Sequence, residues 1–221
     1  ERLSREAAIA GKALPFTPHV QKTLRGLPDG RIKASQFCDT SLSPGSRQAA
    51  LRAAGAVVAA VENVLKGKCA SAFCLVRPPG HHAGPAGLEG GCVSCGFCIF
   101  NNVAIGAAHA LREFAPDRVD NGSTTCSRVA IIDFDVHHGN GTEGIVRDRF
   151  AHRFPNQVFF SSIHLYDSEG HGRYAFYPGS GRENDLESNV VNIALAPLWR
   201  KLEKSSPMTG DPVLDRGAHT P

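Results

Sequence analysis

The chain has 221 residues, of which 42% are hydrophobic, enough to bury one sizeable core in a single globular domain over residues 1–221. Lysine and arginine number 24 against 21 acidic residues, so charge offers no argument for direct binding to nucleic acid or to a membrane. The longest mostly apolar stretch, 49–65, falls short of the roughly 20 residues that span a bilayer. The first 16 residues contain no apolar core of a secretory signal.

The seven cysteines are an odd number and lie mostly inside apolar segments. This usage fits reduced thiols better than a disulfide framework, as in cytosolic and nuclear proteins. We therefore expect an intracellular protein located in the nucleus, in the cytoplasm or in both.

The predicted elements alternate between helix and strand. Apolar residues at helical spacing predict a helix from the SPGSRQ segment to Leu65, and the RPPG segment ends the strand that follows because proline cannot donate to a ladder. The pattern then predicts strands over 70–76, 128–136, 156–166 and 189–195, and helices over 101–114 and 141–150. Surface loops are expected at 84–95 and 120–127, and the polar tail 201–221 is left unassigned.

The strands are apolar throughout instead of alternating, which is typical of a parallel sheet covered by helices on both faces. The predicted fold class is therefore α/β, with three α/β/α layers and a mainly parallel sheet. Ligands of such folds gather beyond the carboxyl ends of the strands. Three predicted strands end there at polar residues, namely His81 with His82, Asp135 with His137, and His164.

Side chains two apart on a strand project the same way, so Asp133, Asp135 and His137 are expected to line one side. A carboxylate and an imidazole suit Zn²⁺, or iron(II) in its place, and a catalytic zinc takes three protein ligands and a water. Asp135 and His137 supply two ligands, and Asp133 is better placed to accept a hydrogen bond from a histidine. With a neutral histidine as base, this set predicts a metal-dependent amidohydrolase.

The segments RPPGHHA, GFCIFNNVAIGA and IIDFDVHHGNGTEGI, in this order, resemble the zinc-dependent histone deacetylase family. The similarity is greatest to its class II branch and to the related acetylpolyamine amidohydrolases, and it runs from about Asp39 to about Ala196. The resemblance implies the eight-stranded parallel sheet shared with arginase, in agreement with the α/β prediction.

The resemblance also implies the residue roles. His82 would be the general base, and His81, hydrogen-bonded to Asp133, its charged partner that stabilises the tetrahedral intermediate. Asn140 stands where class I members carry an acid, which is the class II-like feature, and it is expected to leave His82 less basic. Asp135 and His137 would be the zinc ligands.

For the substrate, the resemblance implies a tunnel for the acyl-lysine stem lined by Gly96 and Phe97, with Tyr177 on the other wall and Asp39 holding the substrate backbone at the rim. The implied substrate is acetyl-lysine in histones or other proteins, with an acetylated polyamine as the alternative. Corepressor-type partners are compatible with the resemblance but do not follow from the residues.

Two parts of the family pattern have no counterpart in the chain: the third metal ligand, an Asp in a later GFD-type loop, and a Tyr that donates to the oxyanion. Asp211 and Asp215 follow no predicted strand and are not assigned as ligands. We therefore expect a fragment that lacks the C-terminal part of the catalytic domain and is inactive alone. The 84–95 loop is longer than expected for the family and borders the mouth of the site.

Two other readings stay open. Cys92, Cys95 and Cys98 have the C-x2-C-x2-C spacing of an iron–sulfur or structural zinc site, although a fourth thiolate at the usual spacing is missing. The chain could also be a non-catalytic fragment with an interaction role. His109 and His164 are interpreted as structural, and the remaining cysteines as packing residues.

Overall fold

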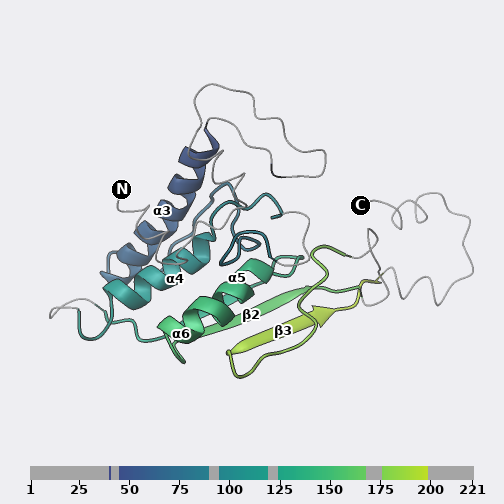
Figure 1. Cartoon of the computed structure of the whole chain (residues 1–221). Coiled ribbons are helices and arrows are strands. Elements are labelled where there is room, and N and C mark those ends of the chain that lie inside the picture. The colour runs from purple at the N-terminus through teal and green to yellow at the C-terminus, as the bar shows by residue number, and fades with distance from the viewer. Residues whose placement is uncertain (1–39, 41–44, 90–94, 119–123, 168–175, 199–221) are drawn as a thin grey trace, which may run out of the picture.

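The computed structural model describes residues 40, 45–89, 95–118, 124–167 and 176–198 (Figure 1). Its elements in chain order are α3 (Ser46–Leu65), α4 (Asn102–Glu113), β1 (Val129–Asp133), α5 (Asn140–Ile145), the π-helical η1 (Val146–Phe150), α6 (Ala151–Arg153), β2 (Val158–Leu165) and β3 (Val190–Leu195). The predicted helices and three of the four predicted strands are present. Asp39, Cys92, Asp211, Asp215 and the 201–221 tail lie outside the described residues.

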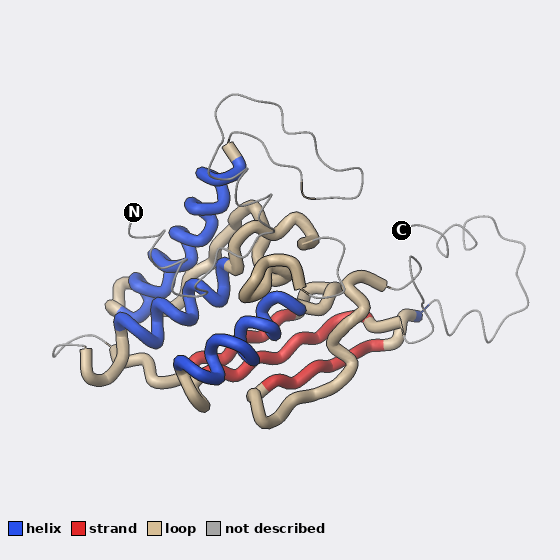
Figure 2. The backbone as a smooth tube through the Cα atoms, viewed as in Figure 1, coloured by secondary structure: helices blue, strands red, loops and turns tan. Residues whose placement is uncertain are grey.

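The three strands form a parallel sheet in the order β1-β2-β3, which confirms the predicted α/β class. Ile131 pairs with Phe160, and Phe160 pairs with Val190, so these side chains share one face. All three are buried, and the helices lie over this face (Figure 2). The core of the described domain therefore sits between the sheet and the α4–α5–η1 layer.

The opposite face of the sheet carries apolar side chains that are exposed among the described residues. Ile132, Phe159 and Ile193 are 53%, 38% and 43% exposed. Of the three layers that the sequence predicts, the described elements supply the sheet and the helices on one side (Figures 1 and 2). The apolar strand pattern therefore belongs to a sheet that has helical cover on only one face in the described part.

The prediction of a strand over 70–76 is wrong. This segment is extended, but Phe73 and Leu75 are 90% and 91% exposed, and no described strand lies beside it. β1 pairs with β2 only, so its other edge is open within the described sheet. A groove of about 1010 Å³ lies between this edge, the 72–74 segment and helices α3 and α4. Without a ladder partner, an apolar extended segment does not form a strand.

Helix α3 packs on α4 through small side chains. Ala50, Ala53, Ala54 and Val58 are buried on α3, and a side chain at Gly106 of α4 would meet Val57 at 2.7 Å. With 20 residues, α3 is long and apolar enough to cross a membrane by length and composition, so the length argument drawn from 49–65 was wrong. Its alanine face packs against α4, and 22% of the apolar window is buried within the described residues.

The loop that follows His82 is packed more tightly than a surface loop. Gly84 and Gly87 exchange backbone hydrogen bonds of 2.8 and 3.1 Å, and the Glu89 carboxyl lies against Gly84 and Gly144. Burial, followed by the nearby Asp148 and Glu143 carboxylates, raises the pKa of Glu89 to about 7. The described part of the 84–95 loop is thus a layer on α5, not the exposed loop that the sequence predicts.

Replacing Ile132 with lysine should weaken self-association of the 221-residue chain. An open strand edge beside an apolar groove is a template for pairing with another chain, and a charged side chain there blocks it. Sedimentation velocity over a range of concentrations would measure the effect. Leu186→Lys, at an exposed position outside the groove, is the matched control. Equal self-association of Ile132→Lys and the unchanged chain would contradict the prediction.

Glu89→Gln should stabilise the fold at high pH. The folded protein keeps a proton on Glu89 between pH 4.5 and about 7, where the unfolded chain has lost it. This contribution to stability is therefore present below pH 4.5 and lost as the pH rises through about 7.

The gain at about pH 8 should be about 1–2 kcal/mol after discounting for partial exposure. Denaturant unfolding of both proteins at several pH values, with Glu187→Gln as control, would measure it. A difference between Glu89→Gln and wild type that does not change with pH would contradict the assignment.

Candidate active site

The loop after β1 is shaped by its own carboxylates. Asp133 Oδ1 accepts a hydrogen bond from the backbone N–H of Asp135 at 3.1 Å, and Asp135 Oδ1 accepts one from the N–H of His137 at 2.8 Å. These bonds turn the chain, so β1 ends at Asp133. The prediction that Asp135 and His137 continue the strand is wrong, although the turns still bring both side chains together. His137 Nδ1 lies 3.1 Å from Asp135 Oδ1.

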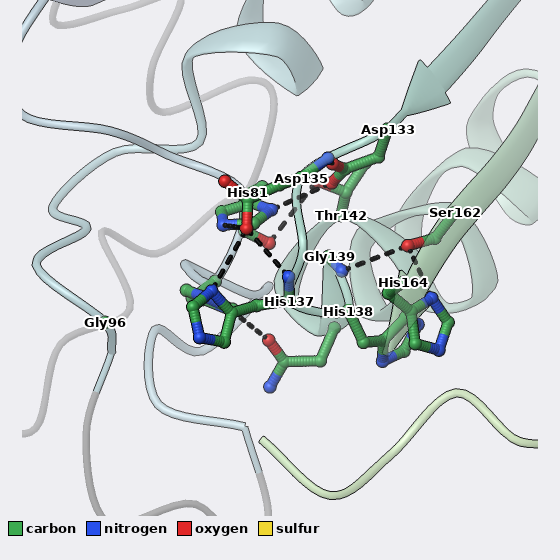
Figure 3. A network of polar contacts seen from close by, with 12 residues as sticks. His81, Gly96, Asp133, Asp135, His137, His138, Gly139, Thr142, Ser162 and His164 are labelled. Carbon is green, nitrogen blue, oxygen red and sulfur yellow. Dashed lines mark hydrogen bonds and ion pairs between the residues drawn. The ribbon is translucent and has the colours of Figure 1, made fainter. Parts of the chain in front are cut away.

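His81 meets the end of β1. Its Nδ1 lies 2.8 Å from Asp133 Oδ2, and its Nε2 lies 3.9 Å from Asp135 Oδ1 (Figure 3). The contact expected between Asp133 and His81 is therefore present. A carboxylate beside Nδ1 holds the imidazole proton there and fixes the orientation of the ring.

His82 is buried beside His81, with the two ring centroids 4.0 Å apart. Its Nδ1 lies 2.8 Å from the side-chain oxygen of Asn140. Burial, followed by the neighbouring His81, lowers the pKa of His82 to about 4. The hydrogen bond to Asn140 acts in the opposite direction and raises the pKa, so burial and His81 cause the net shift.

Two glycines allow the backbone to approach His82. A side chain at Gly96, where φ is +50°, would lie 2.3 Å from the His82 ring, and one at Gly141 would lie 2.4 Å from the His82 backbone carbon. Glycine is needed where chains pass this closely. The GFC and GNG segments of the sequence therefore meet at one histidine.

Thr142 and Asn101 hold the histidine loop, and sequence reasoning assigned neither of them to the site. The Thr142 N–H donates to the His81 carbonyl at 3.0 Å, and the Asn101 amide donates to Thr142 Oγ1 and to the Ala83 carbonyl, both at 3.0 Å. Asn101 Oδ1 also caps α4 by accepting from the Ala104 N–H at 3.1 Å. The signal in the sequence is the asparagine at the start of the predicted 101–114 helix, because asparagine favours the N-cap position.

Aromatic side chains stand over the histidines. The Tyr177 ring centroid lies 4.9 Å from that of His82 and 5.9 Å from that of His137. Phe176, which the sequence did not single out, stacks on His137 at 5.1 Å with an angle of 11°. Phe97 has a φ of +65° and is half-exposed, and its backbone N–H donates to Thr40 Oγ1 at 3.1 Å.

Asp135 and His137 carry a carboxylate and an imidazole, the donor types that suit a zinc ion. Burial raises the pKa of Asp135, but the hydrogen bond from the His137 N–H and the nearby His81 outweigh it, so the pKa is lowered. The carboxylate is therefore ionised, and both side chains are partly open to solvent. No group of three His, Cys, Asp or Glu side chains suited to a metal occurs within the described ranges. The donor set fits a zinc ion, with two of the three expected protein ligands.

A second set of polar side chains lies under the first. His164, buried, contacts Ser162 Oγ at 2.9 Å and the Gly181 carbonyl at 3.0 Å (Figure 3). His138, also buried, contacts Ser180 Oγ and Glu143 Oε2, both at 2.9 Å. These contacts support the structural interpretation of His164, and sequence reasoning missed His138 and Glu143.

The cysteine cluster finds little support in its two described members. Cys95 and Cys98 are buried, and burial raises the pKa of the Cys98 thiol to about 12. Metals bind the thiolate form of cysteine, whereas burial keeps the Cys98 side chain in its protonated thiol form. Cys98 Sγ instead accepts from the His82 N–H at 3.5 Å, so it packs under the histidine loop.

Comparison with known proteins links this geometry to one family. The histone deacetylase domain matches residues 15–208 of the chain. Type-2 histone deacetylase 1 of Dictyostelium discoideum is 47% identical over 143 residues, covering 65% of this chain and 8% of that protein. Histone deacetylase 8 of Arabidopsis thaliana is 35% identical over 189 residues, covering 83% of this chain and 42% of that protein.

A solved structure shows the same fold. The crystal structure of the HDA15 HD domain superimposes with a TM-score of 0.61 at 30% identity, covering 86% of this chain and 47% of that one. The chain thus spans less than half the length of these relatives. The family match covers most of the chain, the sequence motifs fall at the paired histidines and carboxylates, and the fold agrees, so the chain belongs to the histone deacetylase family.

Proposed function

We propose that the chain carries the catalytic histidines and two metal ligands of a zinc-dependent lysine deacetylase, which hydrolyses the acetyl amide of acetyl-lysine in histones or other proteins. The observation that carries the proposal is that two adjacent histidines each contact a polar side chain at or after the end of β1. His81 contacts Asp133, and His82 contacts Asn140, each at 2.8 Å. Asp135 and His137 lie beside them with the donors of a zinc site.

Each histidine has a role that follows from its surroundings. His82, with a pKa of about 4, is neutral at neutral pH and can accept a proton from the attacking water. His81 Nδ1 contacts Asp133, and the ring would stabilise the negative charge that develops in the tetrahedral intermediate. A zinc ion held by Asp135 and His137 would polarise the amide carbonyl and the water. Tyr177 lies over His82 and would contact the acyl-lysine stem.

We also infer an intracellular location, in the nucleus or the cytoplasm. None of the five described cysteines, Cys69, Cys74, Cys95, Cys98 and Cys126, forms a disulfide with another of them. Cysteines without disulfides fit a reducing compartment.

An acetylated polyamine is the alternative substrate. Measuring acetate release by the complete protein from an acetyl-lysine peptide and from an acetylated polyamine would distinguish the two substrates. Turnover of the polyamine alone would replace the lysine deacetylase proposal.

Asp135→Ala and His137→Ala, made in the complete protein, should remove both bound zinc and deacetylase turnover while leaving the fold largely intact. Each deletes a metal ligand that is partly open to solvent, so little core packing is lost. Elemental analysis, acetate release and circular dichroism would measure the three effects. Glu187→Gln is an acidic control outside the site. Full zinc occupancy with normal turnover in either variant would contradict the assignment.

His82→Ala should retain zinc but lose on the order of a hundredfold or more in rate, the usual contribution of positioned proton transfer. His81→Ala should lose less, because it removes charge stabilisation and leaves the base in place. Steady-state rates with zinc content measured on the same samples would check the order. Near-wild-type rates for both variants would mean that the paired histidines are structural.

A further inference from the structure

Glu143 on α5 is the centre of a group of polar side chains that the proposed reaction does not use. Its Oε2 accepts hydrogen bonds from His138 Nε2 at 2.9 Å and from the Asn192 amide at 2.8 Å. Its Oε1 accepts from Arg147 Nε at 2.9 Å and lies 2.8 Å from Arg147 Nη2. A single largely buried carboxylate thus joins the loop after β1, helix η1 and strand β3.

Each of these three partners makes a second contact with one short segment, residues 180–185. His138 Nδ1 lies 2.9 Å from Ser180 Oγ, and the Asn192 amide donates to the Glu183 carbonyl at 2.9 Å. Arg147 Nη1 donates to the carboxylate of Asp185. The three partners of Glu143 therefore contact the 180–185 segment at three separate points along its length.

The same stretch of chain carries the aromatic wall of the site. Phe176 stacks on His137, and Tyr177 packs against His82, only a few residues before Ser180. His138 follows His137 directly in the chain, and its ring contacts that of His164 with centroids 4.6 Å apart (Figure 3). The 180–185 segment is thus tied to the loop that carries the proposed metal ligand.

We infer that Glu143 is a positioning residue, which fixes residues 180–185 through His138, Asn192 and Arg147 and so sets the orientation of Phe176 and Tyr177 over the site. The role of this wall in substrate binding rests on the proposed deacetylase function. Hydrogen bonds to a carboxylate are stronger than those between neutral groups. The carboxylate also holds the His138 proton on Nε2, which leaves Nδ1 to accept from the Ser180 hydroxyl.

Residue-resolved hydrogen exchange in Glu143→Gln tests the inference without any assay of activity. The reporters are the backbone N–H groups of Asp185, which donates to the Val190 carbonyl at 2.9 Å, and of Asn192, which donates to Asn184 Oδ1 at 2.8 Å. Their protection should fall about tenfold, the effect of losing one charge-assisted hydrogen bond. Amides of β2 should not change, nor should the reporters in Glu183→Gln, an exposed carboxylate of the same segment.

Unchanged protection in Glu143→Gln, or an equal loss across β2, would overturn the inference, because the second result is what a merely structural role produces. Ser180→Ala provides a second variant if Glu143→Gln does not fold. It removes only the hydroxyl end of one contact, and it should lower the protection of Asp185 but not that of β2. Unchanged protection at Asp185 in Ser180→Ala would then count against the inference.

Kinetics of Glu143→Gln in the complete protein test whether the aromatic wall of Phe176 and Tyr177 depends on Glu143. KM for an acetyl-lysine peptide should rise several-fold, with zinc content and kcat close to those of the wild type, because the wall binds substrate and does not take part in the chemistry. An unchanged KM would overturn the inference about the wall. Absence of turnover in the wild type would instead refute the proposed function and leave the exchange result as an independent test.

Discussion

The contact between Asp133 and His81 is the constraint on which the rest of the site depends. Asp133 is the last residue of β1, and His81 belongs to a loop 52 residues earlier in the chain, yet the two side chains meet at 2.8 Å. The other oxygen of Asp133 turns the backbone toward Asp135. One carboxylate therefore both orients the imidazole and begins the loop that carries the metal donors, so the two halves of the site cannot shift independently.

The sheet places this carboxylate at the helix-covered face. Asp133, Ser162 and Asn192 are cross-strand partners that follow the buried Ile131, Phe160 and Val190 on the same face. The register of the parallel sheet therefore places polar groups from three strands in one row beyond the apolar core. Their burial is tolerated because most of them have hydrogen-bond partners.

The site has two layers of polar side chains, and the layers differ in their contacts. The upper layer, with His81, His82, Asp135 and His137, has the donors and bases that the proposed reaction needs. The lower layer, centred on Glu143, links helices to strands through charge-assisted bonds. Burial raises the pKa of Glu143, but hydrogen bonds from His138 and Asn192 outweigh this effect, so the pKa is lowered and the carboxylate stays charged. The lower layer thereby fixes the 180–185 segment beside the upper one.

The sequence by itself determined the alternation of helices and strands, the α/β class and the residues of the upper layer, because helical periodicity, apolar strands and adjacent motifs such as HHA and DFDVHH are local patterns. Tertiary structure alone decided three other features. The 70–76 segment is not a strand, because pairing depends on a neighbour and not on composition. Asp135 and His137 lie in a turn and not on β1, because side-chain oxygens compete with the ladder for backbone N–H groups. The role of Glu143 was invisible in the sequence, because Asn192 lies 49 residues away from it and only the fold brings the two together.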